Sequence, residues 1–171
     1  MKSIFYYLCL AILLVGCKTE VDNSVNETFE ANSKTALANL EGFENENVDY
    51  SMYAVDVVMR QAVFGTENDS MSLKEMKESD KELWARYDLK ILTKPIVLLP
   101  GVNPQTREPD GSVRHYTDWE VILPATDSTE ARSGVIQLYE SYDFNTEGKI
   151  IFQQVYGDFT GLMTYLNSGG E

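Results

Sequence analysis

The chain has 171 residues, a formal net charge of −13 at pH 7 and two cysteines. This length is enough for one hydrophobic core, so we expect a single folded domain. Binding to nucleic acid requires clustered Lys and Arg, but the 14 basic residues are scattered among 27 acidic ones, so we expect no nucleic-acid partner. The acidic surface also repels anionic lipid headgroups, so any membrane attachment must have another source.

The N-terminus supplies such a source, because it resembles a bacterial lipoprotein signal peptide. Met1–Ser3 is short and basic, and Ile4–Val15 is apolar but shorter than the roughly 20 residues that span a bilayer. Leu14-Val15-Gly16-Cys17 follows and is similar to a lipobox. The resemblance implies cleavage before Cys17 and attachment of acyl chains to its thiol and new amine. An ordinary signal peptide with a chance cysteine and an uncleaved anchor are the alternatives.

The lipobox interpretation sets the expected location and domain bounds. Residues 1–16 would be removed, and residues 17–23 would form a lipidated cysteine and a short tether. Lys18 is not the Asp that retains enterobacterial lipoproteins in the inner membrane, so we expect a lipid-anchored envelope protein, at the outer membrane where the host has one. Cys9 lies in the leader, so the mature domain would have no disulfide and its stability must come from packing.

Two segments are predicted to be amphipathic helices. Ser24–Phe43 and Ser72–Tyr87 both begin with a capping-box pattern and carry apolar residues at helical spacing. The other positions of the first helix are mainly Glu, Asn, Lys and Thr, which is typical of a solvated face. The apolar positions are Val25, Phe29, Ala36, Leu40 and Phe43 in the first helix, and Leu73, Met76, Leu83, Trp84 and Tyr87 in the second.

The segment between these helices has mixed character. We expect a helix or turn over Asp49–Ala54 and then a strand over Val57–Phe64, because valines dominate its second half. Gly65–Ser70 has the composition of a loop. A strand placed between two helices predicts an α+β rather than an all-α protein.

From Asp88 onward the pattern predicts strands. Leu89–Leu99 is expected to be one strand, with Pro95 marking a sheet edge or a bulge. Val102–Gly111 is expected to be a polar connection, Val113–Leu123 the next strand and Pro124–Arg132 a turn.

The last forty residues predict a long antiparallel hairpin and a closing helix. Gly134–Phe144 and Lys149–Tyr156 are apolar and aromatic, and Asn145–Gly148 between them has turn chemistry. Asp158 or Thr160 can cap a helix that extends to Leu166. The whole pattern predicts an α+β fold, in which a curved antiparallel meander sheet has helices on one face.

This order of elements resembles the nuclear transport factor 2-like superfamily. Tyr142–Ile150, with its aromatic residues and its Gly148-Lys149-Ile150 turn, and Tyr156-Gly157-Asp158-Phe159 are most similar to the SnoaL-like and ketosteroid-isomerase-like branch. The resemblance covers residues 24–167 and leaves residues 168–171 as a tail. It implies a cone fold, in which a strongly curved sheet wraps against helices and leaves an apolar pocket at its open end.

Alternation along the strands predicts which side chains line the cone. On Val113–Leu123 one face carries His115, Thr117 and Trp119, and the other carries Tyr116 and Asp118. We expect the Trp119 face to be inside, because it is the more apolar. If Glu140, Tyr142 and Phe144 point inward, Ile151, Gln153 and Val155 on the next strand are expected to face them.

The titratable residues leave two functions open. Glu140 occupies the position at which the ketosteroid isomerases, by resemblance, hold a protonated acid, whereas Gln61 stands where their carboxylate base is expected. An enzyme performing proton transfer next to a carbonyl would therefore use Glu140 as acid and His115 or Asp118 as base. A partly exposed histidine without a catalytic role is the alternative for His115, and Glu140 can equally be a rim carboxylate.

The first hypothesis is therefore a non-catalytic module that binds a small apolar ligand or a partner, and the proton-transfer enzyme is the alternative. The expected pocket residues are Trp119, Glu140, Tyr142, Gln153 and Trp84. One histidine is too few for a multi-His metal site, and no phosphate-binding or nucleophile motif is present, so no metal or cofactor is predicted. Aromatic residues such as Tyr116 and Tyr139 on the outer sheet face predict a homodimer.

Overall fold

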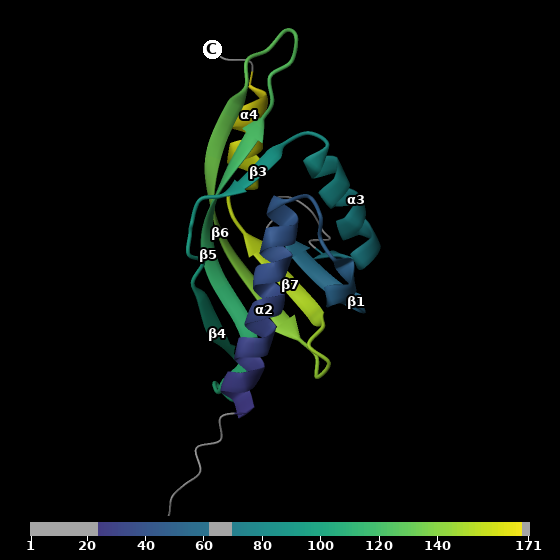
Figure 1. The fold of residues 1–171 in the computed structure, drawn as a ribbon, viewed down its shortest axis with the longest axis vertical. Helices are drawn as coiled ribbons and strands as arrows, with labels where there is room; N and C mark the ends of the chain where they lie inside the picture. The colour runs from purple at the N-terminus through teal and green to yellow at the C-terminus, as the bar shows by residue number, and fades with distance from the viewer. Residues whose placement is uncertain (1–23, 62–69, 169–171) are drawn as a thin grey trace, which may run out of the picture.

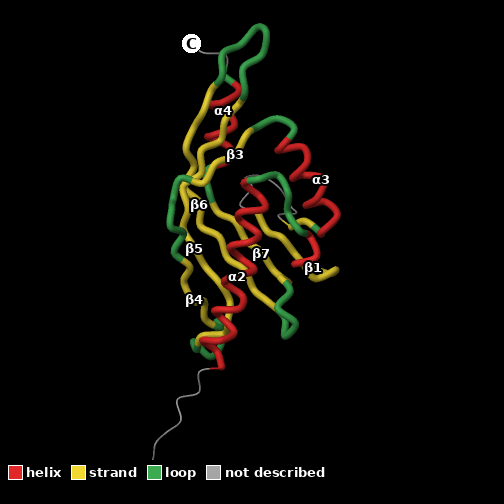
Figure 2. Tube along the Cα trace, viewed as in Figure 1, coloured by secondary structure: helices red, strands yellow, loops and turns green. Residues whose placement is uncertain are grey.

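The structure is a computed structural model that describes residues 24–61 and 70–168, so the predictions for the leader, Cys17 and the tether lie outside the described residues. Three helices and a curved sheet form one body, which confirms the α+β class and the cone shape (Figures 1 and 2). Among the described residues, no helix combines the length and apolar character needed to cross a bilayer.

Helix α2 spans Ser24–Glu44 and ends one residue beyond the predicted boundary. It packs across the concave side of the sheet against strand β5, Pro109–Leu123, as Figure 1 shows. Ala36 and Leu40 are buried as the periodicity predicted, but so are Asn32 and Asn39, which the pattern assigned to a solvated face. The Asn32 amide donates to the backbone oxygen of Gly111 at 2.8 Å, so burial does not leave its amide nitrogen without a partner.

The segment after α2 has the predicted mixed character with a shifted boundary. A 3₁₀ turn, η1, spans Tyr50–Met52 and is capped by Asp49, whose carboxylate accepts from the Ser51 backbone. Strand β1 then spans Tyr53–Gln61 and begins four residues earlier than predicted. A two-residue strand β2, Ser70–Met71, pairs with β1 where the sequence predicted the end of a loop.

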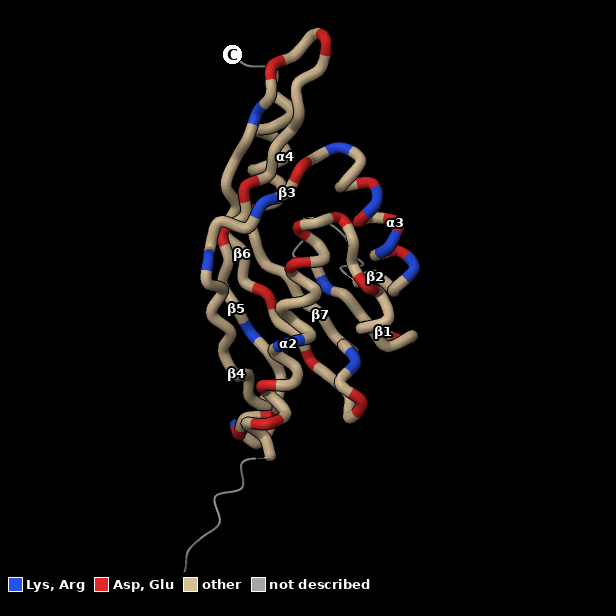
Figure 3. The backbone as a smooth tube through the Cα atoms, viewed as in Figure 1, with Lys and Arg blue, Asp and Glu red and all other residues tan. Residues whose placement is uncertain are grey.

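Helix α3 spans Leu73–Trp84 and has the predicted capping box. The Ser72 hydroxyl accepts from the Glu75 backbone, and the Glu75 carboxylate accepts from the Ser72 backbone at 2.8 Å. Figure 3 shows acidic and basic residues distributed along this helix. Met76 and Asp80 are its buried residues, so one face of the helix is turned toward the sheet and brings a carboxyl with it.

The predicted strand Leu89–Leu99 is in fact two strands, which corrects the sequence analysis. β3 spans Asp88–Ile91 and β4 spans Leu98–Val102, and both pair with β5 at different places along its length. Pro95 lies in the connection between the two strands, and the Lys94–Pro95 peptide bond is cis. A single straight strand could not follow β5 here, because the sheet curves between the two pairings.

Strand β5 spans Pro109–Leu123, so the connection after β4 is shorter than the predicted Val102–Gly111. Strands β6, Arg132–Phe144, and β7, Ile150–Tyr156, form the predicted hairpin. Its turn is closed by the Asn145 side-chain oxygen, which accepts from two backbone N–H groups, and by Gly148 at φ +73°. Helix α4, Phe159–Asn167, follows with Asp158 as its N-cap.

The sheet order is β2-β1-β7-β6-β5-β3, with β4 also on β5. β1 runs parallel to β7, so the sheet is mixed and not the purely antiparallel meander that the sequence predicted. The parallel pairing follows from the long connection through α3 and β3–β6, which returns the chain to β1 from the far side. It also places α3 beside β1, at the open end of the cone (Figure 1).

Two groups of buried apolar side chains hold the helices to the sheet. One group lies between the β5–β6 hairpin and α4 and includes Trp119, Ile136 and Leu166. The other lies beneath α2 and α3 and includes Ala36 and Met76. Each fully buried Val, Leu or Ile side chain in such groups contributes about 1.5–3 kcal/mol.

Candidate functional site: a cavity with two acidic walls

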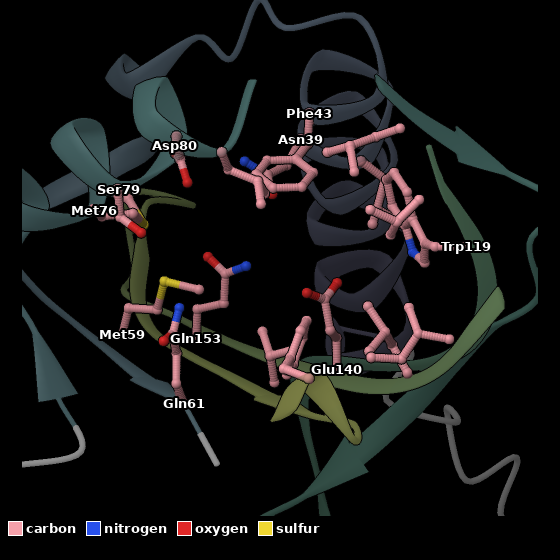
Figure 4. Close-up of a pocket in the computed structure, with 18 of the residues that line it drawn as sticks. Asn39, Phe43, Met59, Gln61, Met76, Ser79, Asp80, Trp119, Glu140 and Gln153 are labelled. Atoms are coloured by element: carbon pink, nitrogen blue, oxygen red, sulfur yellow. The ribbon is translucent and has the colours of Figure 1, made fainter. Parts of the chain in front are cut away.

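A cavity of about 110 Å³ lies between α2, α3 and the concave face of the sheet (Figure 4). Twenty-one of the residues that the structure describes line it, and most are apolar or aromatic. The polar residues among them are Asn39, Tyr53, Gln61, Ser79, Asp80, Glu140, Tyr142 and Gln153. An apolar cavity with a few polar groups is the usual form of a small-molecule site.

Strand register places the first group of polar side chains on the sheet wall. β5 and β6 pair His115 with Glu140, and β6 and β7 pair Tyr142 with Gln153. Glu140 and Tyr142 are separated by two residues, so both point to the same face of the sheet. Trp119 is on this face as well, and the predicted inward orientation of the Trp119 face is confirmed by burial of Val113, His115, Thr117, Trp119 and Val121.

The β7 strand deviates from the predicted alternation at its start. Ile150 is fully buried and Ile151 is 38% exposed, so Ile151 does not face inward as expected. The register shift between Asp143 and Phe144 on the neighbouring strand inverts the alternation there. Beyond it, Gln153 and Val155 point inward as the sequence predicted.

The polar groups of this wall form a connected hydrogen-bond network. Asn39 donates to the Tyr53 hydroxyl at 2.8 Å, and Tyr53 donates to the Gln153 side-chain oxygen at 2.9 Å. The Tyr142 hydroxyl lies 3.0 Å from Glu140 Oε2 and 3.3 Å from Asn39 Oδ1. One hydroxyl has one proton, so Tyr142 donates to the nearer oxygen, that of Glu140. The network ties three strands to α2.

His115 lies directly behind Glu140. Its Nε2 atom is 3.0 Å from Glu140 Oε2, but the N–H direction is not aligned for a hydrogen bond, so the contact is mainly electrostatic. Trp119 donates to the Thr117 hydroxyl at 3.1 Å, which leaves the Thr117 proton free to donate to His115 Nδ1 at 3.4 Å. With Thr117 donating to Nδ1, the proton of the neutral imidazole is on Nε2, the atom beside Glu140.

Both inner tyrosines stay protonated at neutral pH. Burial raises the pKa of Tyr142 and of Tyr53 far above the usual value, and the nearby Glu140 charge adds to the effect in both cases. For Tyr53 the hydrogen bond from Asn39 acts in the opposite direction but is smaller than the effect of burial. The two hydroxyls therefore serve as hydrogen-bond donors within the cavity wall.

The second wall is helix α3, which presents Asp80 to the same cavity. Figure 4 shows the Asp80 and Glu140 carboxyls on opposite sides of the empty space. Asp80 is 8% exposed, and its Oδ2 accepts a hydrogen bond from Tyr50 at 2.8 Å. Burial raises the pKa of Asp80 to about 6, although the Tyr50 hydrogen bond acts in the opposite direction. Such a carboxyl can exchange a proton near neutral pH.

The structure brings together most of the predicted pocket residues but not all of them. Trp119, Glu140, Tyr142 and Gln153 line the cavity. Trp84 does not line it and packs behind Phe43, with 5.6 Å between ring centroids. Trp84 is the last residue of α3, and at that end of the helix Leu83 lines the cavity instead.

The two candidate bases from the sequence are placed elsewhere. His115 is fully buried and not partly exposed, and it reaches the cavity only through Glu140. Asp118 is on the outer sheet face, as its alternation with Trp119 predicted, and it is not a cavity residue. Among the described residues, no three His, Cys, Asp or Glu side chains form a group that could hold a metal ion.

Among the polar cavity residues, sequence reasoning missed Asn39, Tyr53, Ser79 and Asp80. Asn39 was treated as a solvated helix position and Asp80 was given no role, although each lies four residues from an apolar stripe residue, Phe43 for Asn39 and Met76 for Asp80. That spacing was a usable signal, because polar side chains in register with a buried stripe must face the interior. Tyr53 is the first residue of β1, where the sequence predicted a helix or turn.

Comparisons with known proteins bear on the fold. No protein-family model and no curated protein sequence matches the chain. Among solved structures, a putative polyketide cyclase from Xanthomonas campestris pv. campestris superposes with a TM-score of 0.63 at 14% identity, over 82% of this chain and 99% of that one. A nuclear transport factor 2-like protein from Burkholderia xenovorans gives 0.59 at 9% identity, over 81% and 97% of the two chains.

An epoxide hydrolase of M. tuberculosis superposes with a TM-score of 0.55 at 13% identity, over 82% of this chain and 92% of that one. These proteins carry different activities in their names, and their identity to this chain is low, so the likeness concerns the fold. The chain has the α+β cone fold of the nuclear transport factor 2-like and SnoaL-like proteins, as the sequence resemblance predicted.

Proposed function

We propose that the chain binds a small, mainly apolar ligand in the cavity between α2, α3 and the sheet. The observation that carries the proposal is the cavity itself, in which apolar and aromatic side chains surround a small number of polar groups. Its volume of 110 Å³ is close to the about 150 Å³ of an engineered apolar cavity that holds benzene, so the ligand has about one ring. The Glu140–Tyr142–Gln153 wall would hold its polar end.

The test is a thermal-shift measurement with single-ring probes on the full-length chain in detergent. A ligand present at about 100 times its Kd stabilises the folded state by about 2.7 kcal/mol, which corresponds to roughly 5 °C or more for a domain of this size. Ser79 lines the cavity from α3, so Ser79→Phe should fill the space and abolish the shift, whereas Ser79→Ala should preserve it. Equal shifts in both variants would contradict binding in the cavity.

Acid–base catalysis next to a carbonyl is the second candidate function. The observation in its favour is that two carboxyls, Glu140 and Asp80, face one cavity from opposite walls, and that the pKa of Asp80 is raised to about 6. In this version Glu140, with Tyr142 and His115 behind it, donates to the carbonyl oxygen, and Asp80 is the base. Structural neighbours named as a putative polyketide cyclase and an epoxide hydrolase show that enzymes are described on this fold.

A hydrogen–deuterium exchange experiment distinguishes the two candidate functions. Proton transfer next to a carbonyl exchanges the α-hydrogens of a simple ketone in D₂O, and NMR follows this with cyclohexanone. A catalyst would accelerate exchange and lose the acceleration in both Asp80→Asn and Glu140→Gln. The non-catalytic module that we favour predicts an exchange rate equal to that of buffer.

We also propose that the protein is anchored in the cell envelope through lipid on Cys17. The lipobox-like Leu14–Cys17 supports this, and two acyl chains at about 0.8 kcal/mol per buried methylene would outweigh repulsion from an acidic surface. Palmitate labelling with membrane fractionation tests it. Wild type should be labelled and found with membranes, and Cys17→Ser should be unlabelled; an unlabelled, soluble wild type would refute the anchor.

A homodimer through the outer sheet face is the remaining proposal. Tyr116, Tyr139 and Tyr156 form a row of rings there, with centroids 5.1 and 6.2 Å apart, and Tyr116 is 65% exposed. Light scattering of the detergent-solubilised chain should give a dimer that Tyr116→Arg dissociates. A wild-type monomer at all concentrations would exclude this assembly.

A further inference from the structure

The cavity lining has acidic but no basic side chains among the described residues. Among the described residues that line it, Asp80 and Glu140 are the carboxylic acids and none is Lys, Arg or His. Five aromatic rings also line the space: Phe43, Tyr53, Trp119, Tyr142 and Phe159. The negative faces of such rings attract a cation, and so do the two carboxyls.

The two acids differ in the polar groups that the protein places next to each carboxyl. Glu140 has His115 at 3.0 Å and a hydrogen bond from Tyr142. Asp80 has one hydrogen bond, from Tyr50 to Oδ2; among the described residues no group donates to its Oδ1 and no cation lies within ion-pair distance. The residue is 8% exposed, and its side chain points into the cavity (Figure 4).

A buried carboxylate with this little compensation destabilises the fold, because desolvation disfavours its charge. With a pKa of about 6 it is nevertheless mostly ionised at neutral pH. Its charge and its open oxygen are therefore available to a partner that enters the cavity.

We infer that the cavity takes a small organic cation, an amine with about one apolar ring, whose ammonium lies between Asp80 and Glu140. This inference rests on the proposed ligand-binding function and names the ligand class. An ammonium has up to three N–H donors, which match the open Asp80 oxygen and the oxygens of the facing wall. The ring is surrounded by apolar and aromatic side chains. A carboxylate of the same shape would meet two like charges and is excluded.

The inference predicts a pH dependence. The titratable groups around Asp80 are Tyr50 from η1, Tyr53 from β1, and Glu140 and Tyr142 from β6; on its own helix, the Lys77 ammonium lies 4.9 Å from the Tyr50 ring centroid. The tyrosines stay neutral near pH 6, so Asp80 is the wall group whose raised pKa falls in this range. Below pH 6 Asp80 gains a proton, and its attraction for a cation is lost.

The test compares three probes that share one ring and differ in charge: benzylamine, benzyl alcohol and benzoate. Calorimetric titration uses the full-length chain in detergent at pH 8 and at pH 5. Because a hydrogen bond to a charged group contributes about 1.5–3 kcal/mol, benzylamine should bind at least about tenfold more tightly than benzyl alcohol at pH 8, with no detectable binding of benzoate. The advantage should shrink at pH 5.

Variants of the cavity residues test whether benzylamine binds in the cavity. Asp80→Asn keeps an acceptor for Tyr50 and should reduce the affinity for benzylamine about tenfold more than the affinity for benzyl alcohol. Glu140→Gln should act in the same direction. Asp118→Asn, the same change on the outer face, is the matched control and should alter neither affinity. Ser79→Phe should abolish benzylamine binding.

The outcomes distinguish the inference of cation binding from the proposed ligand-binding function on which it rests. If benzyl alcohol binds as tightly as benzylamine, the cation inference is overturned and the ligand-binding function stands. If the amine advantage survives in Asp80→Asn, or benzylamine still binds to Ser79→Phe, the cation binds elsewhere and the inference is again overturned. If none of the probes binds, both fail.

Discussion

The two carboxyls of the cavity are buried to the same degree but held in different ways. Glu140 is 7% exposed and Asp80 is 8% exposed. Glu140 lies on a strand between two others, where the ladder fixes His115 opposite it and Tyr142 beside it. Asp80 lies on a helix at the edge of the cone, where η1 supplies one hydroxyl. The comparison shows that the fold supplies more partners to the sheet wall than to the helix wall, which supports the proposal that a ligand completes the helix wall.

The largest expected change in stability comes from replacing His115, the residue beside Glu140. His115→Leu replaces the polar neighbour of a buried carboxyl with an apolar side chain, and loss of such a contact costs up to about 3 kcal/mol in the free energy of unfolding. His115→Gln, which retains an N–H donor, should cost clearly less. Chemical denaturation of the full-length chain measures both, and a loss below about 1 kcal/mol for His115→Leu would show that the sheet wall does not depend on this pair.

A smaller effect of opposite sign is expected at Asp80. Its pKa rises from 3.8 to about 6 on folding, so the folded state prefers the protonated form. The wild type therefore loses stability as pH rises from about 4 to about 6, and the loss persists above pH 6. Because the shift is about two units and the group retains some solvent, Asp80→Asn should be more stable than wild type by about 2 kcal/mol at pH 7 and about equal at pH 4.

The matched control for that prediction is Asp118→Asn. The outer-face carboxyl is not part of the cavity, and a surface substitution of this kind changes stability by less than about 0.5 kcal/mol. Unfolding curves recorded from pH 4 to pH 8 for both variants give the comparison. Equal pH profiles for wild type and Asp80→Asn would mean that Asp80 is not desolvated on folding.

The smallest effect concerns Tyr50, the hydrogen-bond donor to Asp80 in the described part of the chain. Tyr50→Phe removes the hydroxyl that stabilises the ionised form and should destabilise the protein by about 1–2 kcal/mol at pH 8. In the Asp80→Leu background the same change should cost much less, because no acceptor remains. A double-mutant cycle measures the coupling between the two side chains, and additive effects would argue against the hydrogen bond.

These differences between the walls also show what the sequence could predict. The hairpin register follows from the Asn145–Gly148 turn and from alternation, so Glu140, Tyr142 and Gln153 were placed on the cavity wall from sequence alone. The pairing of His115 with Glu140 depends on the stagger between β5 and β6, which no local turn signal specifies. Burial of the histidine was therefore missed.

The helix wall was harder to predict because its environment is made by distant segments. Asp80 is buried by the packing of α3 beside β1, and its hydroxyl partner lies 30 residues away on η1. The parallel β1–β7 pairing that creates this arrangement joins the two ends of the domain. Helical periodicity gives the direction of a side chain but not the residues that it contacts. The division between β3 and β4 was missed for a related reason, because sheet curvature depends on tertiary structure.

The most direct test of the account is an NMR titration of the Asp80 carboxyl in the full-length chain, with ¹³C-labelled aspartate and assignment by Asp80→Asn. Without ligand, the account predicts a midpoint near pH 6. With saturating benzylamine the midpoint should fall toward the ordinary aspartate value, because a bound cation favours the ionised form. A free midpoint near 4, or one that saturating amine leaves unchanged, would contradict the claim that the helix wall holds an uncompensated charge for a cationic ligand.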